Sequence, residues 1–235
     1  MDELKNRALA FGLSLSDSAL AQFEEYLAYL TERNQVMNLT AITERKEIIE
    51  KHFLDSLALT QVANFDRKRL IDIGTGAGFP GLPLKIAVPG LSLTLLDSHN
   101  KRVTFLKTLT ERLSLQDVSA VHARGEEWVK SPGVRESYDY ATSRAVARLN
   151  LLLELSLPYV RVGGAFLAMK AADSDEELQE AKAAAAILGG EMETCHDYVL
   201  PGTEIKRRIV VVRKLYPTAE VYPRRFAKMQ KEPLG

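Results

Sequence analysis

The first 66 residues carry apolar side chains at the spacing that is typical of helices. One helix is predicted over residues 17–34, where Ser16 or Asp17 stands at the position of an N-terminal cap. A second helix is predicted over residues 44–65. The stripes expected to be buried are Leu20, Phe23, Leu27 and Leu30 in the first helix, and Ile48, Ile49, Phe53 and Leu57 in the second. We therefore predict an N-terminal helical extension over residues 1–66.

From residue 69 the pattern changes to short β-rich runs, most of them separated by helical runs. The runs that predict strands are RLIDIG, SLTLLD, VSAVHA, YDYATS, GAFLAMK, HDYVL and RRIVVVRKL. Strands that alternate with helices indicate a mostly parallel sheet with helices on both faces. Only the turn-like PGTEIK separates the last two runs, so these are expected to form an antiparallel hairpin at the sheet edge. The expected organisation is a Rossmann-like α/β domain over 67–215 and a basic tail over 216–235.

Composition narrows the class of protein without identifying it. The 31 basic and 31 acidic residues cancel, so any polyanionic partner must be recognised by a local charge asymmetry. No apolar run approaches the roughly 20 residues that span a bilayer. Cys195 is the single cysteine, and the four histidines lack paired spacing, so neither a disulfide nor a metal site is expected. These features predict a soluble, cytoplasmic protein without a bound metal.

The segment 71–81 reads IDIGTGAGFPG and can be read in two registers. Counted from Gly76, it satisfies the G-x-G-x-x-G fingerprint of NAD-binding folds. Counted from Asp72, it gives an acidic residue followed by Gly74, Gly76 and Gly78, as in loops that bind S-adenosylmethionine. The second register is favoured, because the first glycine of a fingerprint should follow the strand directly and because Asp72 then lies near a cofactor amine.

Asp97 ends the second predicted strand and supports nucleotide binding in either register. A carboxylate at this position can accept hydrogen bonds from both hydroxyls of a ribose, and both cofactor classes contain that ribose. An NAD-dependent oxidoreductase therefore stays as the alternative, although no acid for hydride transfer is recognisable.

The fourth predicted strand ends in YDYATSRA, residues 138–145, where a methyltransferase usually faces the reacting atom. Enzymes that methylate exocyclic amines typically carry Asn or Asp followed by Pro-Pro-Tyr or Pro-Pro-Phe here, and this motif is absent. Cys195 lies far from any loop that could supply a nucleophile for cytosine C5. An acceptor that loses no proton before attack, such as guanine N7, fits this sequence. Arg144 is then predicted to position cofactor or substrate, and a surface salt bridge is the alternative.

Positive charge accumulates toward the C-terminus, where residues 201–235 contain nine Lys or Arg against three Glu. Aromatic residues lie between these cations, a combination that suits phosphate contact and base stacking. A solvated tail without a ligand is the alternative. The candidate RNA-binding residues are Lys101, Arg102, Lys170, Arg207, Arg224, Arg225 and Lys228.

Several motifs in order make the sequence resemble the RsmG (glucose-inhibited division protein B) family of bacterial small-subunit rRNA methyltransferases. The motifs are NLTAI at 38–42, HFLDSL at 52–57, DIGTGAGFPGLPLKI at 72–86, LLDSHNKRVTFL at 95–106, RGEEW at 124–128, YDYATSRAVARL at 138–149, AMK at 168–170 and YPRR at 222–225. The resemblance implies a class I methyltransferase fold with a seven-stranded, mostly parallel sheet and an antiparallel C-terminal strand.

The same resemblance implies transfer of a methyl group from S-adenosylmethionine to N7 of a guanine in 16S rRNA, free or in a small-subunit particle, by a monomer. Arg144 would be the catalytic residue. With the glycine loop included, the residues expected to bind the cofactor are Asp72, Gly74, Gly76, Gly78, Phe79, Asp97, Ser98, His99, Gly125, Glu126 and Arg144. A non-catalytic RNA-binding or ribosome-assembly protein on the same fold is a further alternative.

Overall fold

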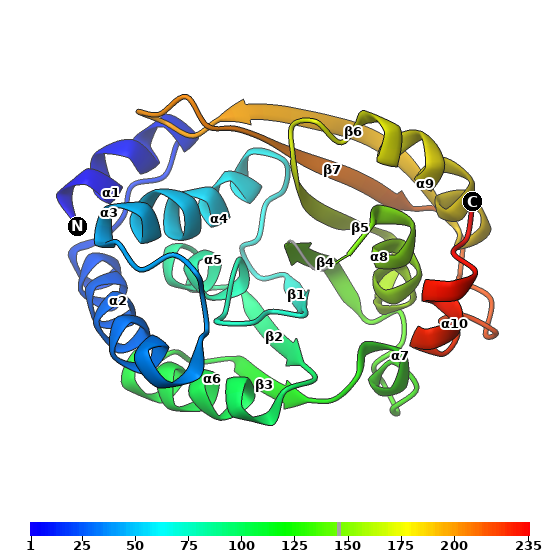
Figure 1. The fold of residues 1–235 in the computed structure, drawn as a ribbon, viewed down its shortest axis with the longest axis horizontal. Helices are drawn as coiled ribbons and strands as arrows, with labels where there is room; N and C mark the ends of the chain where they lie inside the picture. The colour runs from blue at the N-terminus through cyan, green and yellow to red at the C-terminus, as the bar shows by residue number, and fades with distance from the viewer. Residues whose placement is uncertain (145–146) are drawn as a thin grey trace.

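A computed structural model describes residues 1–144 and 147–235. Seven strands form one sheet in the order β3-β2-β1-β4-β5-β7-β6 (Figure 1). The strands are β1 Arg69–Ile73, β2 Ser92–Asp97, β3 Val118–His122, β4 Tyr138–Arg144, β5 Val160–Ala171, β6 Gly190–Val199 and β7 Lys206–Lys214. The first five strands pair in parallel, and β7 runs antiparallel to both of its neighbours. The predicted α/β fold class, including the antiparallel C-terminal strand, is confirmed.

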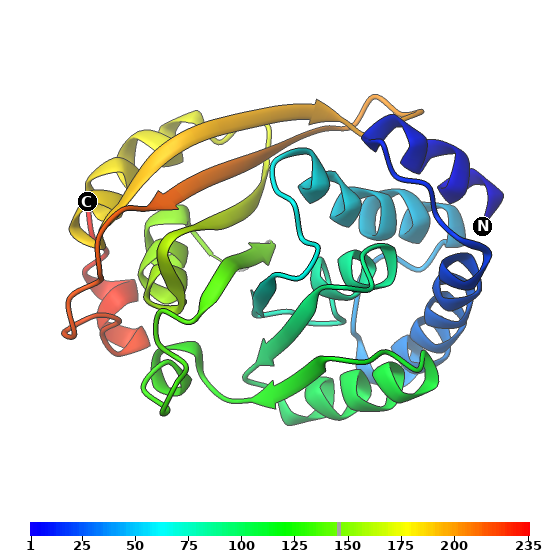
Figure 2. The ribbon, with the colours of Figure 1, turned by 180° about the vertical axis from the view of Figure 1, so that it is seen from behind.

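Helices cover both faces of the sheet (Figures 1 and 2). They are α1 Asp2–Ala8, η1 Leu9–Phe11, α2 Asp17–Met37, α3 Arg45–Ile48, η2 Ile49–Leu54, α4 Asp55–Leu57, η3 Ala58–Gln61, α5 Gly81–Ala87, α6 Asn100–Arg112, α7 Gly125–Trp128, α8 Leu149–Ser156, η4 Leu157–Tyr159, α9 Asp175–Ile187 and α10 Phe226–Lys231. None of the helices in the described parts of the chain has the length and apolarity needed to cross a membrane.

Two hydrophobic cores lie on opposite faces of the sheet, because successive side chains of a strand point to opposite sides. On β5, Leu167 packs into the core beneath the N-terminal helices, α5 and α6, whereas its neighbour Phe166 packs into the core beneath α8 and α9. On β7, Val211 and Val210 divide in the same way. The N-terminal helices therefore share one continuous core with the sheet.

The N-terminal helices form where the apolar spacing predicts them. The Ser16 hydroxyl caps α2 by accepting from the Ala19 N–H at 3.1 Å. Of the predicted stripe in α2, three side chains are buried and Leu20 is half-buried. The second predicted helix is present but is not a regular α-helix: residues Ile49–Leu54 form a π-helix, a wider turn that occurs frequently at functional sites.

The hairpin of β6 and β7 is confirmed, although β6 begins at Gly190 and is longer than the predicted run HDYVL. The hairpin crosses the molecule and reaches the N-terminal helix α1 (Figure 2). The Tyr198 ring on β6 packs edge-on against Phe11, with 6.4 Å between ring centroids. This long strand pair brings side chains from the end of the sequence to the helices at its beginning.

Residues 216–235 follow the body of the protein and do not project from it. Thr218 in this segment is buried: its N–H donates to Glu136 at 2.7 Å, and its hydroxyl donates to the Leu188 carbonyl at 2.6 Å. Further along, Arg224 forms an ion pair with Glu154, whose side chain is 1% exposed. A solvated tail was the alternative reading of this segment, and the structure shows it docked against α8.

Candidate active site at the carboxyl ends of the strands

The glycine loop between β1 and α5 depends on glycine at three positions. Gly74, Gly76 and Gly78 have φ angles of 69°, 62° and 103°, a region that other residues rarely adopt. A Cβ at Gly78 would lie 2.8 Å from the hydroxyl oxygen of Tyr26, so this glycine serves packing. At Gly76 a Cβ would meet no heavy atom within 4 Å, so the loop faces open space there. A cofactor could approach the backbone from that side.

Asp72 at the end of β1 fixes the loop from beneath. Its carboxylate oxygen Oδ2 accepts from the Thr75 hydroxyl at 2.7 Å and from the Gly81 N–H at 2.9 Å. The side chain is fully buried, and burial raises the pKa of the Asp72 carboxyl to about 6. The second oxygen, Oδ1, is buried without a hydrogen-bond partner among the described residues. It therefore retains an unused acceptor beneath the loop.

Asp97 at the end of β2 joins the loop to the neighbouring strand. Its Oδ2 accepts from the Gly76 N–H at 3.0 Å, and its Oδ1 accepts from the His99 N–H at 2.8 Å. The Arg102 guanidinium lies 3.5 Å from Oδ2. Because a carboxylate has about four acceptor positions, Asp97 keeps capacity for hydroxyl donors. Ser98 and His99 are exposed beside it.

Gly125 and Glu126 begin α7, which follows β3 in the chain. A Cβ at Gly125 would lie 3.7 Å from Ile73 at the end of β1, and the Tyr159 hydroxyl donates to the Gly125 carbonyl at 2.5 Å. Glu126 is buried. The structure thus brings these two residues to the same end of the sheet as Asp72 and Asp97.

The aromatic ring of Phe79 connects the glycine loop to the N-terminal helices. Tyr26 on α2 stacks on it at 5.3 Å between centroids, and His52 stacks on it at 4.4 Å. The Tyr26 hydroxyl also donates to the Ala77 carbonyl at 2.6 Å. The loop is consequently anchored by two residues that precede it in sequence, Tyr26 at 51 positions before Ala77 and His52 closer to the loop.

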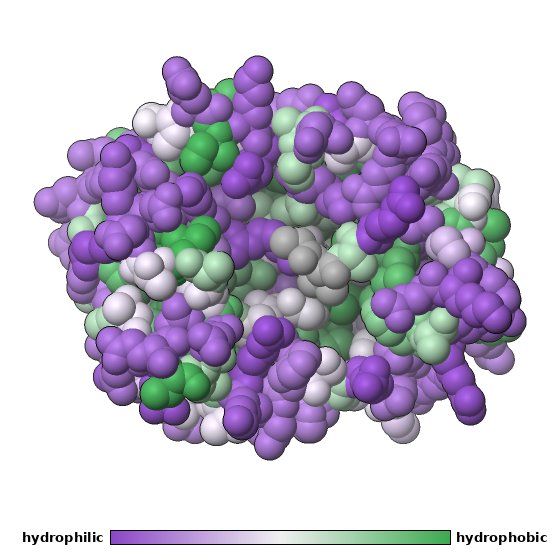
Figure 3. All heavy atoms as spheres, in the orientation of Figure 1, coloured by the Kyte–Doolittle hydropathy of each residue, from purple (hydrophilic) through white to green (hydrophobic). Residues whose placement is uncertain are grey.

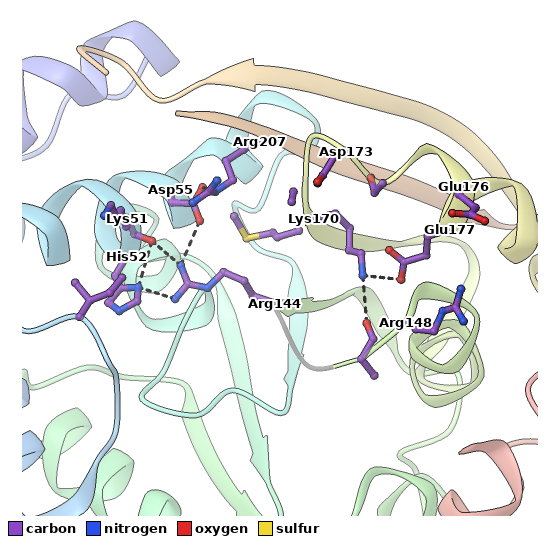
Figure 4. Close-up of a pocket in the computed structure, with 15 residues that line it drawn as sticks. Lys51, His52, Asp55, Arg144, Arg148, Lys170, Asp173, Glu176, Glu177 and Arg207 are labelled. Carbon is purple, nitrogen blue, oxygen red and sulfur yellow. Dashed lines mark hydrogen bonds and ion pairs between the residues drawn. The ribbon is translucent and has the colours of Figure 1, made fainter. Parts of the chain in front are cut away.

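Arg144 ends β4 and points away from its own strand toward the helix that carries His52 and Asp55 (Figure 4). One terminal nitrogen, Nη1, donates to the Lys51 carbonyl at 3.0 Å and to Asp55 Oδ2 at 3.3 Å. The other, Nη2, lies 3.0 Å from His52 Nδ1. The guanidinium carbon is also 5.0 Å from the Phe79 ring centroid. Arg144 is therefore held between the glycine loop and the helical segment.

The His52 imidazole is neutral in this setting. Burial, followed by the nearby positive charge of Arg144, lowers its pKa to about 3. Its Nε2 lies 2.8 Å from the Thr40 hydroxyl. A neutral ring can stay beside the guanidinium, whereas a protonated one would repel it.

Asp55 is buried and gathers donors from three parts of the chain. Besides Arg144, it accepts from the Tyr198 hydroxyl at 2.8 Å, and the Arg207 guanidinium lies 3.8 Å away. Burial and the charge of Asp55 raise the pKa of Tyr198, so its hydroxyl stays a donor. The β6–β7 hairpin thereby contributes two side chains to the same cluster.

A cleft of about 800 Å³ opens beside Arg144, at the ends of β4 and β5. Its mouth is the hollow near the centre of the face in Figure 3, among hydrophilic residues. One wall carries the cations Lys51, Arg144 and Arg207. The other wall, formed by the end of β5 and the start of α9, carries Asp173 and Glu177 with Lys170 and Arg148 (Figure 4). The size is suitable for a nucleotide.

The candidate RNA-binding residues fall into separate groups. Lys170 and Arg207 line the cleft, and Lys170 also donates to Glu177 at 2.8 Å. Arg225 is exposed at the start of α10. Arg224 differs, since its guanidinium and its backbone N–H both bind buried Glu154.

The remaining candidates lie in two places: Lys101 and Arg102 are in the first turn of α6, and Lys228 is exposed on α10. Among residues 1–144 and 147–235, no group of three potential metal ligands gathers.

Comparison with known proteins places this arrangement in a family. The profile of the family described as rRNA small subunit methyltransferase G matches residues 19–208. The chain belongs to this family. Ribosomal RNA small subunit methyltransferase G of Acetivibrio thermocellus is 48% identical over 99% of this chain and 98% of its own length. That of Bacillus subtilis is 47% identical, over 95% and 94%.

Solved structures share the fold of this rRNA small subunit methyltransferase G family member. The M. jannaschii protein TYW2 in complex with AdoMet has a TM-score of 0.56 at 11% identity, covering 74% of this chain and 80% of its own. A Haloferax volcanii putative methyltransferase in complex with its activator Trm112 has a TM-score of 0.57 at 14% identity, covering 80% and 98%. These two structures share the fold, and the family is one of methyltransferases. The register of the glycine loop counted from Asp72 stays a prediction.

The sequence alone indicates no role for His52, Asp55, Tyr26 or Tyr198 in this site. The helical spacing of His52 and Asp55 was visible, but their partner Arg144 is about ninety residues away. Tyr26 lies on the buried face of α2, and an aromatic hydroxyl at such a position is the signal that could have indicated an anchored loop.

Proposed function

We propose that this chain transfers a methyl group from S-adenosylmethionine to N7 of a guanine in small-subunit rRNA. The family supports a small-subunit rRNA substrate. The observation that carries the choice of N7 as acceptor is that the groups around Arg144 cannot readily remove a proton. Asp55 and His52 hold the Arg144 guanidinium, and His52 is a poor base because its pKa is lowered to about 3.

On the cofactor side, the chain's residues match the parts of S-adenosylmethionine. Asp97 would accept from the ribose hydroxyls, Gly76 would allow close approach to the backbone, and Asp72 lies beneath the position expected for the methionine amine. Once bound, S-adenosylmethionine supplies a methyl group on a sulfonium, which a free lone pair can attack in line. Arg144 would hold cofactor and target base in that line from the end of β4.

On the target side, the groups nearest Arg144 are unsuited to removing a proton. His52 has a pKa of about 3 and faces a guanidinium with Nδ1, so its lone pair is occupied. Asp55 is buried and accepts from Arg144 and Tyr198. An acceptor nitrogen that attacks with a lone pair, without first losing a proton, suits this environment. Guanine N7 is such an atom, whereas an exocyclic amine or a hydroxyl is helped by a base.

The test uses small ribosomal subunits from a strain that lacks this methylation, with S-adenosylmethionine labelled in the methyl group. We expect label in the small-subunit rRNA and chain cleavage at one guanine after reduction and aniline treatment, which is specific for N7-methylguanine. Large subunits serve as the control. Label in another base, or in a ribose, would refute the N7 assignment while keeping the methyltransferase.

Calorimetry separates the two alternatives raised by the sequence. Heat on titration with S-adenosylmethionine and none with NAD is the expected result. Binding of neither compound, together with retained binding of small-subunit rRNA, would favour a non-catalytic assembly protein.

A further inference from the structure

The direction of the Arg144 side chain is set from outside its own strand. All four groups around its guanidinium come from elsewhere: the Lys51 carbonyl, His52 and Asp55 in the helical segment, and Phe79 in the glycine loop. The Arg144 side chain is 16% exposed and that of Asp55 is 5% exposed, so water competes little for these contacts.

The contact between Arg144 and His52 requires one particular tautomer. A guanidinium stays protonated and can only donate, so His52 Nδ1 must be the acceptor at 3.0 Å. The ring proton then resides on Nε2, which donates to the Thr40 hydroxyl at 2.8 Å. In the other tautomer, an Nδ1–H would turn to the Lys51 carbonyl 3.2 Å away and would face the guanidinium as a second donor.

Thr40 is itself held in place by an amide on α2. The Asn34 side chain accepts from the Thr40 N–H at 2.9 Å and donates to the Thr40 carbonyl at 2.8 Å. The Thr40 hydroxyl also accepts from the Ile42 N–H at 3.1 Å. The Thr40 hydroxyl is therefore fixed opposite His52 Nε2. Because the guanidinium makes Nδ1 the acceptor, the ring proton is on Nε2 and the Thr40 oxygen accepts it.

We propose that Thr40, His52 and Asp55 are positioning residues for Arg144, and that Thr40 supports the imidazole tautomer whose Nδ1 accepts from the guanidinium by accepting the proton on Nε2. This inference rests on the proposed function in one respect, that Arg144 contacts the reacting partners. It assigns a role in the methyl transfer to the loop 38–43 and to the π-helical segment.

The first experiment replaces the hydroxyl while keeping the side-chain shape. Thr40→Val leaves Nε2–H without an acceptor, Thr40→Ser retains the acceptor, and Thr43→Val makes the same change at an exposed position three residues away. We expect Thr40→Val to lower the single-turnover rate of methylation at saturating cofactor and rRNA particle by roughly ten- to a hundredfold, the factor for leaving one buried donor, Nε2–H, without a partner. Thr40→Ser and Thr43→Val should stay within about twofold of the parent rate.

The second experiment observes the ring directly and needs no activity. In the chain labelled with ¹⁵N at its histidine rings, His52 should show an unprotonated Nδ1 and a protonated Nε2 at neutral pH. His52→Gln identifies this signal by removing it. Thr40→Val should shift the signal toward the other tautomer, and Thr40→Ser should restore it. A change that only loosened the fold would not exchange the two nitrogen signals.

The outcomes separate this inference from the proposed function. A protonated Nδ1 in the parent chain, or a Thr40→Val variant with the parent rate and tautomer, overturns the inference even when the chain methylates rRNA normally. An inactive parent chain with the expected tautomer overturns the proposed function and leaves the hydrogen-bond assignment standing.

Discussion

The two sides of the candidate site are built differently. On the cofactor side, the glycine loop and Asp97 follow two adjacent strands and are joined by one hydrogen bond of 3.0 Å between Gly76 and the carboxylate. On the target side, Arg144 depends on His52 and Asp55 from the N-terminal helices, and Asp55 depends in turn on Tyr198 from the β6–β7 hairpin.

Because of this difference, we expect substitutions on the two sides of the site to have different effects. The cofactor side uses backbone conformation and two carboxylates, Asp72 and Asp97, so a single substitution there should weaken cofactor binding strongly. On the target side, several polar contacts together hold one cation, the Arg144 guanidinium, in place. Substitutions there should alter orientation and rate before they alter binding.

The largest expected effect is on the cofactor side. Asp97→Ala should weaken S-adenosylmethionine binding by about a hundredfold or more, because two hydrogen bonds to a charged group are lost at roughly 1.5–3 kcal/mol each. Calorimetry checks this against Asp17→Ala, a control at a side chain that is 97% exposed. Equal affinity in the Asp97 variant and the control would show that this carboxylate does not hold the cofactor.

Arg144→Ala should have the next largest effect, on rate more than on cofactor affinity. We expect the single-turnover methylation rate to fall by roughly ten- to a hundredfold. Arg144→Lys should recover only a part of it, since an ammonium cannot reproduce the planar set of donors to Lys51, His52 and Asp55. If S-adenosylmethionine affinity fell as far as in Asp97→Ala with no separate loss of rate, Arg144 would belong to the cofactor side alone.

The neutral imidazole on the target side predicts an acid-dependent stability. The folded state lowers the pKa of His52 from its ordinary 6.5 to about 3, so the unfolded chain binds this proton more tightly. Stability from this group is complete above about pH 6.5 and falls as the pH drops toward 3, by at most about 1.4 kcal/mol per pH unit. Asp72 acts in the opposite direction, because its pKa is raised from 3.8 to about 6 and its contribution falls as the pH rises through that range.

A difference measurement isolates the histidine from the aspartate. Urea unfolding of the parent and of His52→Gln between about pH 6.5 and 4.5 should give curves that converge as the pH falls. Parallel curves would mean that His52 keeps its ordinary pKa in the folded chain, and that it is not the neutral acceptor of Arg144.

The smallest effect concerns the candidate RNA-binding cations, and here those of the cleft can be compared with those of the C-terminal segment. Arg207→Gln should reduce the salt dependence of rRNA binding by about one unit of slope, and Arg225→Gln with Lys228→Gln by no more than about one unit each. Arg224→Gln should leave the slope unchanged, because its charge is already paired with Glu154. A change of slope in the Arg224 variant comparable to that of Arg207 would place RNA on the C-terminal segment.

Most of the fold was predictable because its signals are local. Strand runs, helical stripes and the Ser16 cap lie within short segments, and the glycine loop needs only neighbouring residues. The hairpin was predictable from the lack of a helix between its strands. The start of β6 at Gly190 could not be predicted, because residues 191–195 (EMETC) show no regular apolar alternation. These residues form a strand because β7 lies beside them.

The target side could not be derived from the sequence for a physical reason. Arg144, His52 and Asp55 become neighbours only when β4 and the N-terminal helices meet over one core. The docking of Arg224 likewise depends on Glu154, seventy positions earlier, and composition alone made that arginine resemble a free cation. The π-helix at Ile49–Leu54 also cannot be predicted from the spacing of apolar residues.

The bond between the Tyr26 hydroxyl and the Ala77 carbonyl, with the Tyr26 ring stacked on Phe79, has a consequence for protein engineering. Residues 1–66 are not an interchangeable module that can be grafted from one relative onto another. A chimera that exchanges them should take residues 77–79 from the same parent. Tyr26 and the loop residues that it contacts then come from one protein.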